Sequence, residues 1–341
     1  MTEAPVVHDD VVLQVRDLHV SFHTGGGEVR AVRGLDLELR RGEIVGIVGE
    51  SGSGKSTASL ALLGLLPDTA TVRGKAILHG TDLTRLSRAR LDAQRGNRIA
   101  MIYQDPMTAL NPVQRIGAQI AEAYRAHHSS ASRAEANTRA VEMLDLVGIP
   151  GAESRARSYP HEFSGGMRQR AVIAMALVND PDVLVADEPT TALDVTVQAQ
   201  VLELVLDLCE RLGVAVLLIT HDLGVIARVA DRVVVMYAGR PVELAGVDEL
   251  FARPAMPYTT ALLQALPGTT GRHEPLHPIP GQPPSMVRLP AGCPFQPRCP
   301  KADDLCEREE PALSPVGDAH LAACHHPDHQ ATELARTGAE A

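Results

Sequence analysis

The sequence predicts an α/β fold whose central sheet is largely parallel. Short runs of β-branched residues alternate with longer stretches of helical spacing, which is the pattern of strands connected by helices. Apolar runs typical of strands buried on both faces cover residues 43–49, 183–187, 214–220 and 232–239. Helical spacing covers residues 56–66 and 195–213. We expect the second helix to stop at Gly213, because glycine easily adopts the left-handed conformation that ends helices.

Composition limits the partners of the chain. Its 341 residues, 45% of them hydrophobic, can bury a large core and form more than one structural unit. A formal net charge of -10 disfavours binding to nucleic acid backbone. We expect no secretory signal, because acidic residues occupy the N-terminus, and no apolar run reaches the roughly 20 residues of a spanning helix. Any action at a membrane is therefore expected from its surface, through partners.

Proline and cysteine content divides the chain near residue 240. Residues 1–240 contain 8 prolines, whereas residues 241–341 contain 16, together with four of the five cysteines. We therefore predict a separate C-terminal extension over residues 241–330, followed by a flexible tail over residues 331–341. Within the first part we expect an antiparallel β segment at the N-terminal end. The segment 105–163, rich in Ala, Arg, Glu and His, is predicted to form a helical subdomain.

A phosphate-binding loop is predicted at residues 49–57, "GESGSGKST", between a strand and a helix. The segment fits GxxxxGK[ST], in which glycines let backbone N–H groups surround phosphate oxygens at a helix N-terminus. The Lys55 ammonium can reach the β- and γ-phosphates, and the Ser56 hydroxyl can ligate Mg²⁺. The expected nucleotide ligands are Gly49, Ser51, Gly52, Gly54, Lys55, Ser56 and Thr57. The alternative is a turn rich in glycine and serine that binds nothing.

Two carboxylates end the apolar strand 183–187, in "VLVADEP". Asp187 can hold Mg²⁺ through its water shell, and Glu188 can polarise the water that attacks the γ-phosphate. A strand that ends in two acids is, by itself, more typical of a solvated edge. The phosphate loop in the same chain favours the catalytic interpretation.

The segment "FSGGMRQR", residues 163–170, opens an apolar helix. It resembles the LSGGQ signature of the ATP-binding-cassette (ABC) family, with Phe163 and Met167 in place of the first and last residues. The resemblance implies a P-loop, RecA-like cassette. It also implies that Ser164, Gly165 and Gly166 bind the γ-phosphate of an ATP held by the opposite subunit. Ser164 as a simple helix N-cap is compatible with either interpretation.

Further motifs of this family follow in the expected order. The resemblance implies that Gln104, at the end of the strand 98–104, contacts Mg²⁺ and the attacking water. It implies that Asp194 in "TALD" faces the dimer partner and that His221 holds the γ-phosphate. Phe22 lies where the family places an aromatic ring that stacks on adenine, although a core position is the equal alternative. Taken singly, each of these residues is more often structural.

The resemblance implies an ATPase that works as a dimer with Mg²⁺. Each cassette of the family carries half of each of two ATP sites, so ATP binding closes two subunits face to face. Closure and reopening of the dimer drive a conformational change in another protein. In importers, a short helix of the membrane subunit docks between the Gln104 loop and the helical subdomain, so the segment 105–163 is the expected docking surface.

Four segments narrow the resemblance to the D-type ATPase subunits of oligopeptide and dipeptide importers. They are residues 104–112, 253–267, 278–285 and 292–299, and the likeness extends from about residue 11 to residue 325. Met256 departs from that family, which usually has histidine there. The resemblance implies ATP-driven peptide import at the cytoplasmic face of the cell membrane. The implied partners are a homologous F-type ATPase subunit, two transmembrane permeases and, indirectly, an extracytoplasmic binding protein.

Two alternatives remain open at this point. The same type of subunit could serve a nickel or other small-solute importer, because the ATPase does not touch the cargo. A soluble ABC ATPase that is not tied to transport is the alternative of a different class. The single cassette, the absence of heptad repeats and the acidic charge favour the importer.

Four cysteines of the extension predict a metal site. Cys293, Cys299, Cys306 and Cys324 follow the spacing C-x5-C-x6-C-x17-C, without the close pairs common in structural zinc sites. Four thiolates on open loops suit a 4Fe-4S cluster, and some importer subunits with this kind of extension hold one. The alternatives are Zn²⁺ on four cysteines, Zn²⁺ on three cysteines and His325, or buried thiols without metal. Cys209 is predicted to lie in a helix core.

Overall fold

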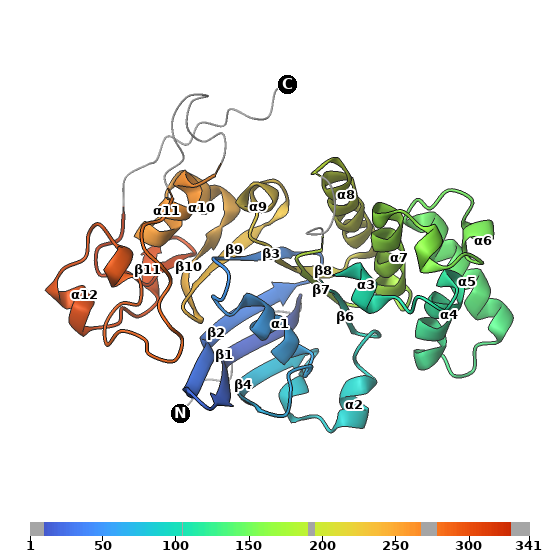
Figure 1. Cartoon of the computed structure of the whole chain (residues 1–341), viewed down its shortest axis with the longest axis horizontal. Helices are drawn as coiled ribbons and strands as arrows, with labels where there is room; N and C mark the ends of the chain where they lie inside the picture. The colour runs from blue at the N-terminus through green and yellow to red at the C-terminus, as the bar shows by residue number, and fades with distance from the viewer. Residues whose placement is uncertain (1–9, 104, 190–194, 267–277, 329–341) are drawn as a thin grey trace. The chain divides into compact units, whose positions relative to one another are not determined.

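The computed structural model describes residues 10–103, 105–189, 195–266 and 278–328 (Figure 1). The chain forms two compact units. The first comprises Met1–Gln14, Glu38–Glu43 and Ile77–Leu218, and the second comprises Val15–Leu37, Ile44–Ala76 and Ile219–Ala341. The predicted flexible tail, residues 331–341, lies outside the described residues.

Parallel, largely buried strands form the core of the first unit. β6 (Ile99–Ile102) pairs in parallel with β7 (Val183–Asp187), and β8 (Ala215–Ile219) follows β7 in the strand order. Every residue of β7 and β8 is buried, which confirms the apolar runs as two-sided strands. α8 (Val195–Leu212) ends where predicted, since Gly213 has a φ of 65°.

Helices dominate the predicted subdomain of the first unit. They are α3 (Pro106–Ala109), α4 (Ile116–His127), α5 (Arg133–Leu146), α6 (Ala152–Arg155) and the 3-10 turn η2 (Pro160–Glu162). Together with α7 (Gly165–Leu177) they form one group in green shades (Figure 1). A capping box of Ser132 and Glu135 starts α5. α4 lies close to the chain at Ala156, because a Cβ at Gly117 would come within 2.7 Å of the Ala156 Cβ.

A second set of strands forms the sheet of the second unit. β3 (Ile44–Val48) pairs in parallel with β9 (Arg232–Tyr237). β10 (Arg240–Gly246), β12 (His320–Ala322) and β11 (Ser314–Gly317) then add antiparallel strands, so the order is β11-β12-β10-β9-β3. The C-terminal extension therefore continues the sheet that carries the phosphate loop.

Short helices connect these strands. They are α1 (Lys55–Leu62), α9 (Leu223–Val229), α10 (Val247–Ala252), α11 (Pro257–Gln264), the 3-10 turn η3 (Gln296–Arg298) and α12 (Asp304–Arg308). α1 ends earlier than the predicted residue 66, because Gly64 has a left-handed φ of 59°.

A separate four-stranded sheet has the order β2-β1-β4-β5. Its strands are β1 (Val11–Thr24), β2 (Gly27–Arg40), β4 (Ala70–Leu78) and β5 (Thr81–Asp82), and the short elements η1 (Leu83–Arg85) and α2 (Arg88–Asp92) follow. Two residues connect β1 to β2, and β4 pairs antiparallel with β5. Since so short a connection joins antiparallel strands, the predicted antiparallel N-terminal part is confirmed.

A buried carboxylate on β10 connects several parts of the extension. Glu243 is 0% exposed and accepts hydrogen bonds from the backbone N–H groups of Ala255 (2.6 Å) and Met256 (3.0 Å). His320 Nε2 lies 2.7 Å from the same carboxylate. A buried carboxylate without such partners is costly, so these contacts hold three parts of the extension together. Met256 itself is buried, which gives the departure from the family pattern a packing role.

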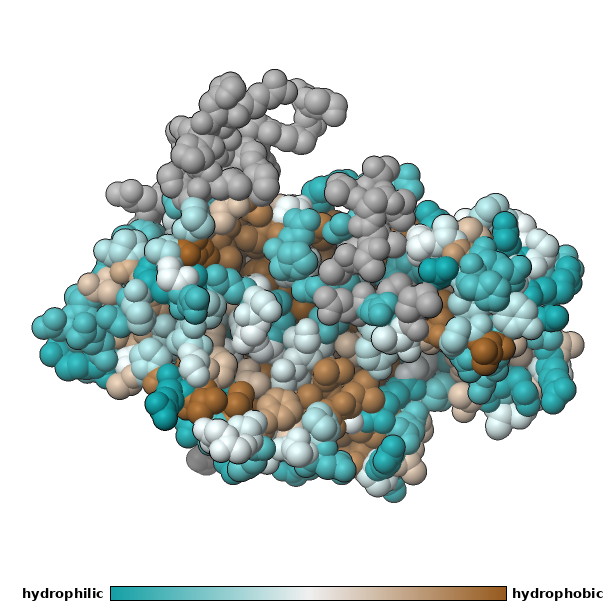
Figure 2. Space-filling view, viewed as in Figure 1, coloured by the Kyte–Doolittle hydropathy of each residue, from teal (hydrophilic) through white to brown (hydrophobic). Residues whose placement is uncertain are grey.

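The described part of the chain contains no helix that is both long and apolar enough to cross a membrane. Hydrophilic residues cover most of the face shown in Figure 2, and hydrophobic residues lie on it in separate patches.

Candidate nucleotide and four-cysteine sites

The phosphate loop lies where predicted, between the end of β3 at Val48 and the start of α1 at Lys55. Two of its glycines are required by close packing. A Cβ at Gly49 would lie 2.2 Å from the Met236 carbonyl oxygen, and a Cβ at Gly54 would lie 2.2 Å from the Ala31 carbonyl oxygen. Both residues also have positive φ, at 149° and 102°, which disfavours any side chain there.

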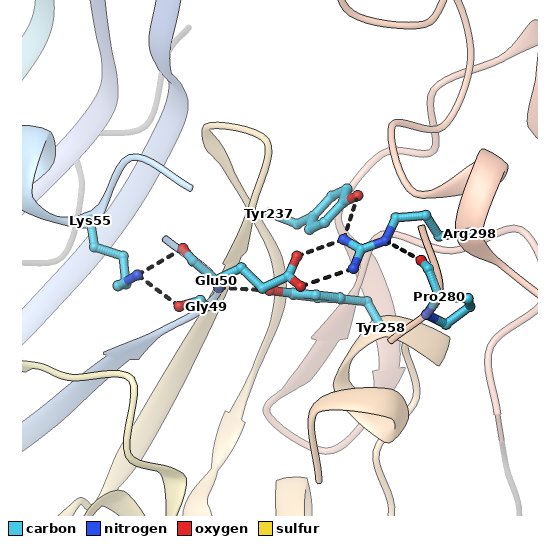
Figure 3. Close-up of polar contacts among 7 residues, drawn as sticks. All are labelled: Gly49, Glu50, Lys55, Tyr237, Tyr258, Pro280 and Arg298. Atoms are coloured by element: carbon cyan, nitrogen blue, oxygen red, sulfur yellow. Dashed lines mark hydrogen bonds and ion pairs between the residues drawn. The ribbon is translucent and has the colours of Figure 1, made fainter. Parts of the chain in front are cut away.

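Lys55 lies inside this loop. It is 7% exposed, and its ammonium donates hydrogen bonds to the carbonyl oxygens of Gly49 (2.7 Å) and Glu50 (2.9 Å) (Figure 3). Ser51, Gly52 and Ser56 are exposed and Thr57 is half-buried. A positive charge at the start of a helix attracts an anion, so the loop can bind phosphate groups.

The two predicted carboxylates lie at the end of β7 in the first unit. Asp187 is the last residue of the strand and is 7% exposed. Glu188 follows with a φ of 47°, a left-handed conformation that is costly for a residue other than glycine. The role of Glu188 as the general base stays a prediction.

His221 follows β8 in the second unit and is exposed. The backbone after it starts α9, which Asp222 caps by accepting hydrogen bonds from the N–H groups of Gly224 (2.9 Å) and Val225 (3.2 Å). The Asp222 N–H in turn donates to the Thr220 hydroxyl at 3.0 Å. These turns hold the backbone on both sides of the histidine.

The signature segment begins α7 in the first unit. Ser164 is the N-cap, and its hydroxyl accepts a hydrogen bond from the Met167 N–H at 3.3 Å. Phe163 is buried, whereas Ser164 and Gly165 are exposed. The N-cap role is therefore confirmed, and the exposed N-terminus of this 13-residue helix remains accessible to an anion.

The structure says little about three of the predicted nucleotide-site residues. Gln104 and Asp194 lie outside the described residues. Phe22 is half-buried near the end of β1, beyond the buried Leu18 and Val20.

The structure also shows contacts to the phosphate loop that sequence reasoning missed. Arg298 forms an ion pair with Glu50, and the Tyr258 hydroxyl accepts a hydrogen bond from the Glu50 N–H at 2.8 Å (Figure 3). These partners are 248 and 208 positions away along the chain. No local pattern could have revealed them.

The four cysteines of the extension line one cavity, together with His325 and His326. Cys293 and Cys306 are buried, and Cys299 and Cys324 are half-buried. Burial raises the pKa of all four thiols, and neighbouring thiols contribute to the rise at Cys293, Cys306 and Cys324, whose pKa reaches about 11. The metal-free thiols are therefore neutral, and a bound cation would favour the thiolate form that ligates metals.

The distances between possible metal-ligand atoms differ within the extension. Among the described residues, one group of three or more ligand atoms lies within 4.8 Å of one another, namely those of Asp303, Cys306 and His326. No three of the four thiols, all in the described ranges, are that close together. Cys209, in contrast, is 1% exposed on α8, and burial raises its pKa to about 12, which confirms its place in a helix core.

Two family models match this chain. The model "ABC transporter" matches residues 32–191, and the model "Oligopeptide/dipeptide transporter, C-terminal region" matches residues 242–306. Among solved structures, a dimeric ATP-binding cassette in a post-hydrolysis state with ADP and Pi superimposes with a TM-score of 0.61 at 27% identity. That comparison covers 69% of this chain and 98% of the cassette. The fold is thus that of an ABC ATPase.

Curated relatives are similar over nearly the whole chain. A probable peptide ABC transporter ATP-binding protein of Sinorhizobium fredii is 53% identical, over 92% of this chain and 95% of the relative. The oligopeptide transport ATP-binding protein OppD of Salmonella typhimurium is 48% identical, over 96% of each chain. OppD of Mycobacterium tuberculosis is 52% identical over 92% of this chain, which spans 51%, about half, of that relative's length. The chain therefore belongs to the ATP-binding proteins of ABC transporters, in the branch that carries the oligopeptide/dipeptide transporter C-terminal region.

Proposed function

We propose that this chain is the ATP-hydrolysing subunit of an importer of dipeptides or oligopeptides. The observation that carries the proposal is the phosphate loop with its buried Lys55, joined in one compact unit to an extension of the peptide-transporter type. The relatives named as oligopeptide or dipeptide transport ATP-binding proteins support the choice of cargo. We propose residues 1–240 as the cassette and residues 241–330 as the extension.

The residues of the loop fit Mg²⁺ and ATP. The carbonyl groups that now hold the Lys55 ammonium can release it to phosphate oxygens, and the exposed Ser56 hydroxyl can ligate Mg²⁺. Bound Mg²⁺ would neutralise charge that develops on the phosphates. Asp187 and Gln104 complete the Mg²⁺ site in this proposal, and Glu188 accepts the proton of the attacking water. The remaining proposed contacts to ATP are those of Gly49, Ser51, Gly52, Gly54, Thr57, Phe22 and His221.

The signature helix gives the proposed working unit. Ser164, Gly165 and Gly166 bind the γ-phosphate held by a second ATPase subunit, and Asp194 faces that subunit. A homologous F-type subunit is the proposed partner. The segment 105–163 is the surface on which a short helix of one of the two proposed permease subunits docks, at the cytoplasmic face of the membrane.

Phosphate release from Mg-ATP tests this proposal. If the active site is shared between two subunits, the rate per chain rises with the concentration of the purified protein, because dimer formation becomes more complete. Each preparation should be compared with and without the candidate partner subunit. No phosphate release at any concentration, with the partner present, would contradict the proposal.

We further propose that the four cysteines hold a 4Fe-4S cluster. All four line one cavity, and no three of their sulfur atoms lie within 4.8 Å of one another among the described residues. A single Zn²⁺ with Zn–S bonds of about 2.3 Å draws its sulfur ligands closer than this, whereas a cluster spans more widely separated thiolates. The proposed role is structural, because the cluster would fasten an extension rich in proline.

Replacement of a ligand should remove the metal. We expect Cys299→Ser and Cys324→Ser to lose most of the iron and the broad absorption near 400 nm after anaerobic purification. Cys209→Ala is the matched control, because Cys209 is buried on α8 in the other unit, and we expect it to retain about four iron per chain. A colourless wild-type protein with stoichiometric zinc would contradict the cluster.

A further inference from the structure

A buried arginine of the extension forms an ion pair with a residue of the phosphate loop. The Arg298 side chain is 3% exposed, and it forms a two-point ion pair with Glu50 through Nη1–Oε2 (2.6 Å) and Nη2–Oε1 (2.9 Å). Its Nε donates to the Pro280 carbonyl oxygen at 2.8 Å, and Nη1 lies 3.3 Å from the Tyr237 hydroxyl (Figure 3). Such planar, two-point pairing is a property of arginine that lysine cannot reproduce.

Both the backbone and the side chain of Glu50 form hydrogen bonds. Its N–H donates to the Tyr258 hydroxyl (2.8 Å), and its carbonyl oxygen accepts from the Lys55 ammonium (2.9 Å). The carboxylate points toward Arg298 and away from Lys55 (Figure 3). Glu50 is thus the one residue in this figure that contacts both the lysine of the phosphate loop and the extension.

An aromatic cluster keeps the guanidinium in place. The rings of Tyr237, Tyr258 and Phe295 lie with centroids 4.5 to 5.3 Å apart, and each side chain is at most 2% exposed. Arg298 lies 5.9 Å from the ring centroids of both Tyr237 and Phe295. A charge enclosed this way needs a nearby counter-charge, and the Glu50 carboxylate supplies it.

The charge of Glu50 is unfavourable for a loop that binds phosphates. A carboxylate that turned toward the loop would repel the polyanionic nucleotide and would compete for the Lys55 ammonium. The Glu50 side chain is 24% exposed, so without Arg298 it could rotate toward solvent and the loop. The ion pair both neutralises this carboxylate and directs it away.

We propose that Arg298 is a positioning residue of the nucleotide site: by holding the Glu50 carboxylate away from the loop, it makes nucleotide affinity depend on the C-terminal extension. The inference rests on the proposed nucleotide site at residues 49–57. It assigns the extension a role in nucleotide binding beyond packing. Arg298 acts through Glu50 and does not touch the nucleotide.

Titration with a fluorescent ATP analogue and Mg²⁺ tests this role in the full-length, metal-loaded protein. We expect Arg298→Met to raise the dissociation constant about tenfold, because an unpaired carboxylate then faces the loop. We expect Glu50→Gln in the same chain to bring it back to within about threefold of the wild-type value, since no carboxylate is left to repel the phosphates. Equal affinity of Arg298→Met and wild type, or no recovery in the double variant, would overturn the inference.

Two further variants keep the test decisive. If Arg298→Met fails to give a cooperative thermal transition, Glu50→Gln alone is measured: we expect affinity at least equal to wild type, and a fivefold or greater loss overturns the inference. Glu310→Gln is the matched control, because Glu310 is an extension carboxylate paired with Arg240 (3.0 Å) and Arg33 (2.5 Å). It should leave affinity unchanged, and a tenfold loss there would overturn the specific role of Arg298. Wild-type protein that does not bind the analogue would instead contradict the proposed function.

Discussion

Glu188→Gln is expected to reduce ATP hydrolysis by roughly 10²-fold or more while ATP binding is retained, since a positioned general base contributes about 10²–10⁴-fold to the rate. The amide has nearly the shape of the carboxylate but cannot take a proton from water. Because ATP then remains uncleaved, the subunits should stay closed. The measurement is phosphate release, combined with size-exclusion chromatography in Mg-ATP to detect a persistent dimer.

The control for this substitution is Glu210→Gln. Glu210 is an exposed carboxylate on α8 in the same unit as Glu188, and its substitution should leave the rate of phosphate release unchanged. Undiminished hydrolysis in Glu188→Gln would show that another group activates the water.

Lys55→Met is expected to abolish nucleotide binding at concentrations that saturate the wild type. The substitution removes the cation of the phosphate loop. Loss of one such electrostatic contact also lowers the rate of hydrolysis of bound ATP by about 10²-fold or more. The Lys55 ammonium is buried and held by two carbonyl groups, so these oxygen atoms also lose their donor. Titration with a fluorescent ATP analogue, followed by phosphate release, measures both effects.

Lys75→Met provides the comparison for this variant. Lys75 is exposed on β4, and its loss should change nucleotide affinity by less than about twofold, because salt screens the charge of an exposed side chain. Nucleotide binding by Lys55→Met with wild-type affinity would exclude the loop as the phosphate site.

Local chemistry explains why the nucleotide motifs could be predicted. Buried strands such as β7 and β8 are apolar at nearly every position, so their sequence alone marks them. The loop depends on glycines whose Cβ would clash with backbone, as at Gly49 and Gly54. The strand pattern and the glycine-rich loop are both visible in the local sequence, although the carbonyl oxygens that exclude a Cβ at Gly49 and Gly54 belong to Met236 and Ala31, which are distant in sequence.

Long-range pairing explains what could not be predicted. The short strand β12 has little apolar pattern of its own, and it pairs with β10, which is far away in sequence, while β11 joins the sheet by pairing with β12. The same holds for Glu50, whose partner Arg298 is 248 positions away. The role of Met256 could not be predicted from the sequence either. Its burial and the hydrogen bond from its N–H to Glu243 become visible only in the folded chain.

Uptake of a radiolabelled peptide by cells that lack this chain tests the central claim most directly. Cells supplied with the wild-type chain should accumulate labelled dipeptide or oligopeptide, whereas cells supplied with Glu188→Gln at equal protein levels should not. Uptake of radioactive nickel measured in the same cells should not depend on the chain. Peptide uptake that is the same with and without the chain, or nickel uptake that requires it, would contradict the proposed peptide importer.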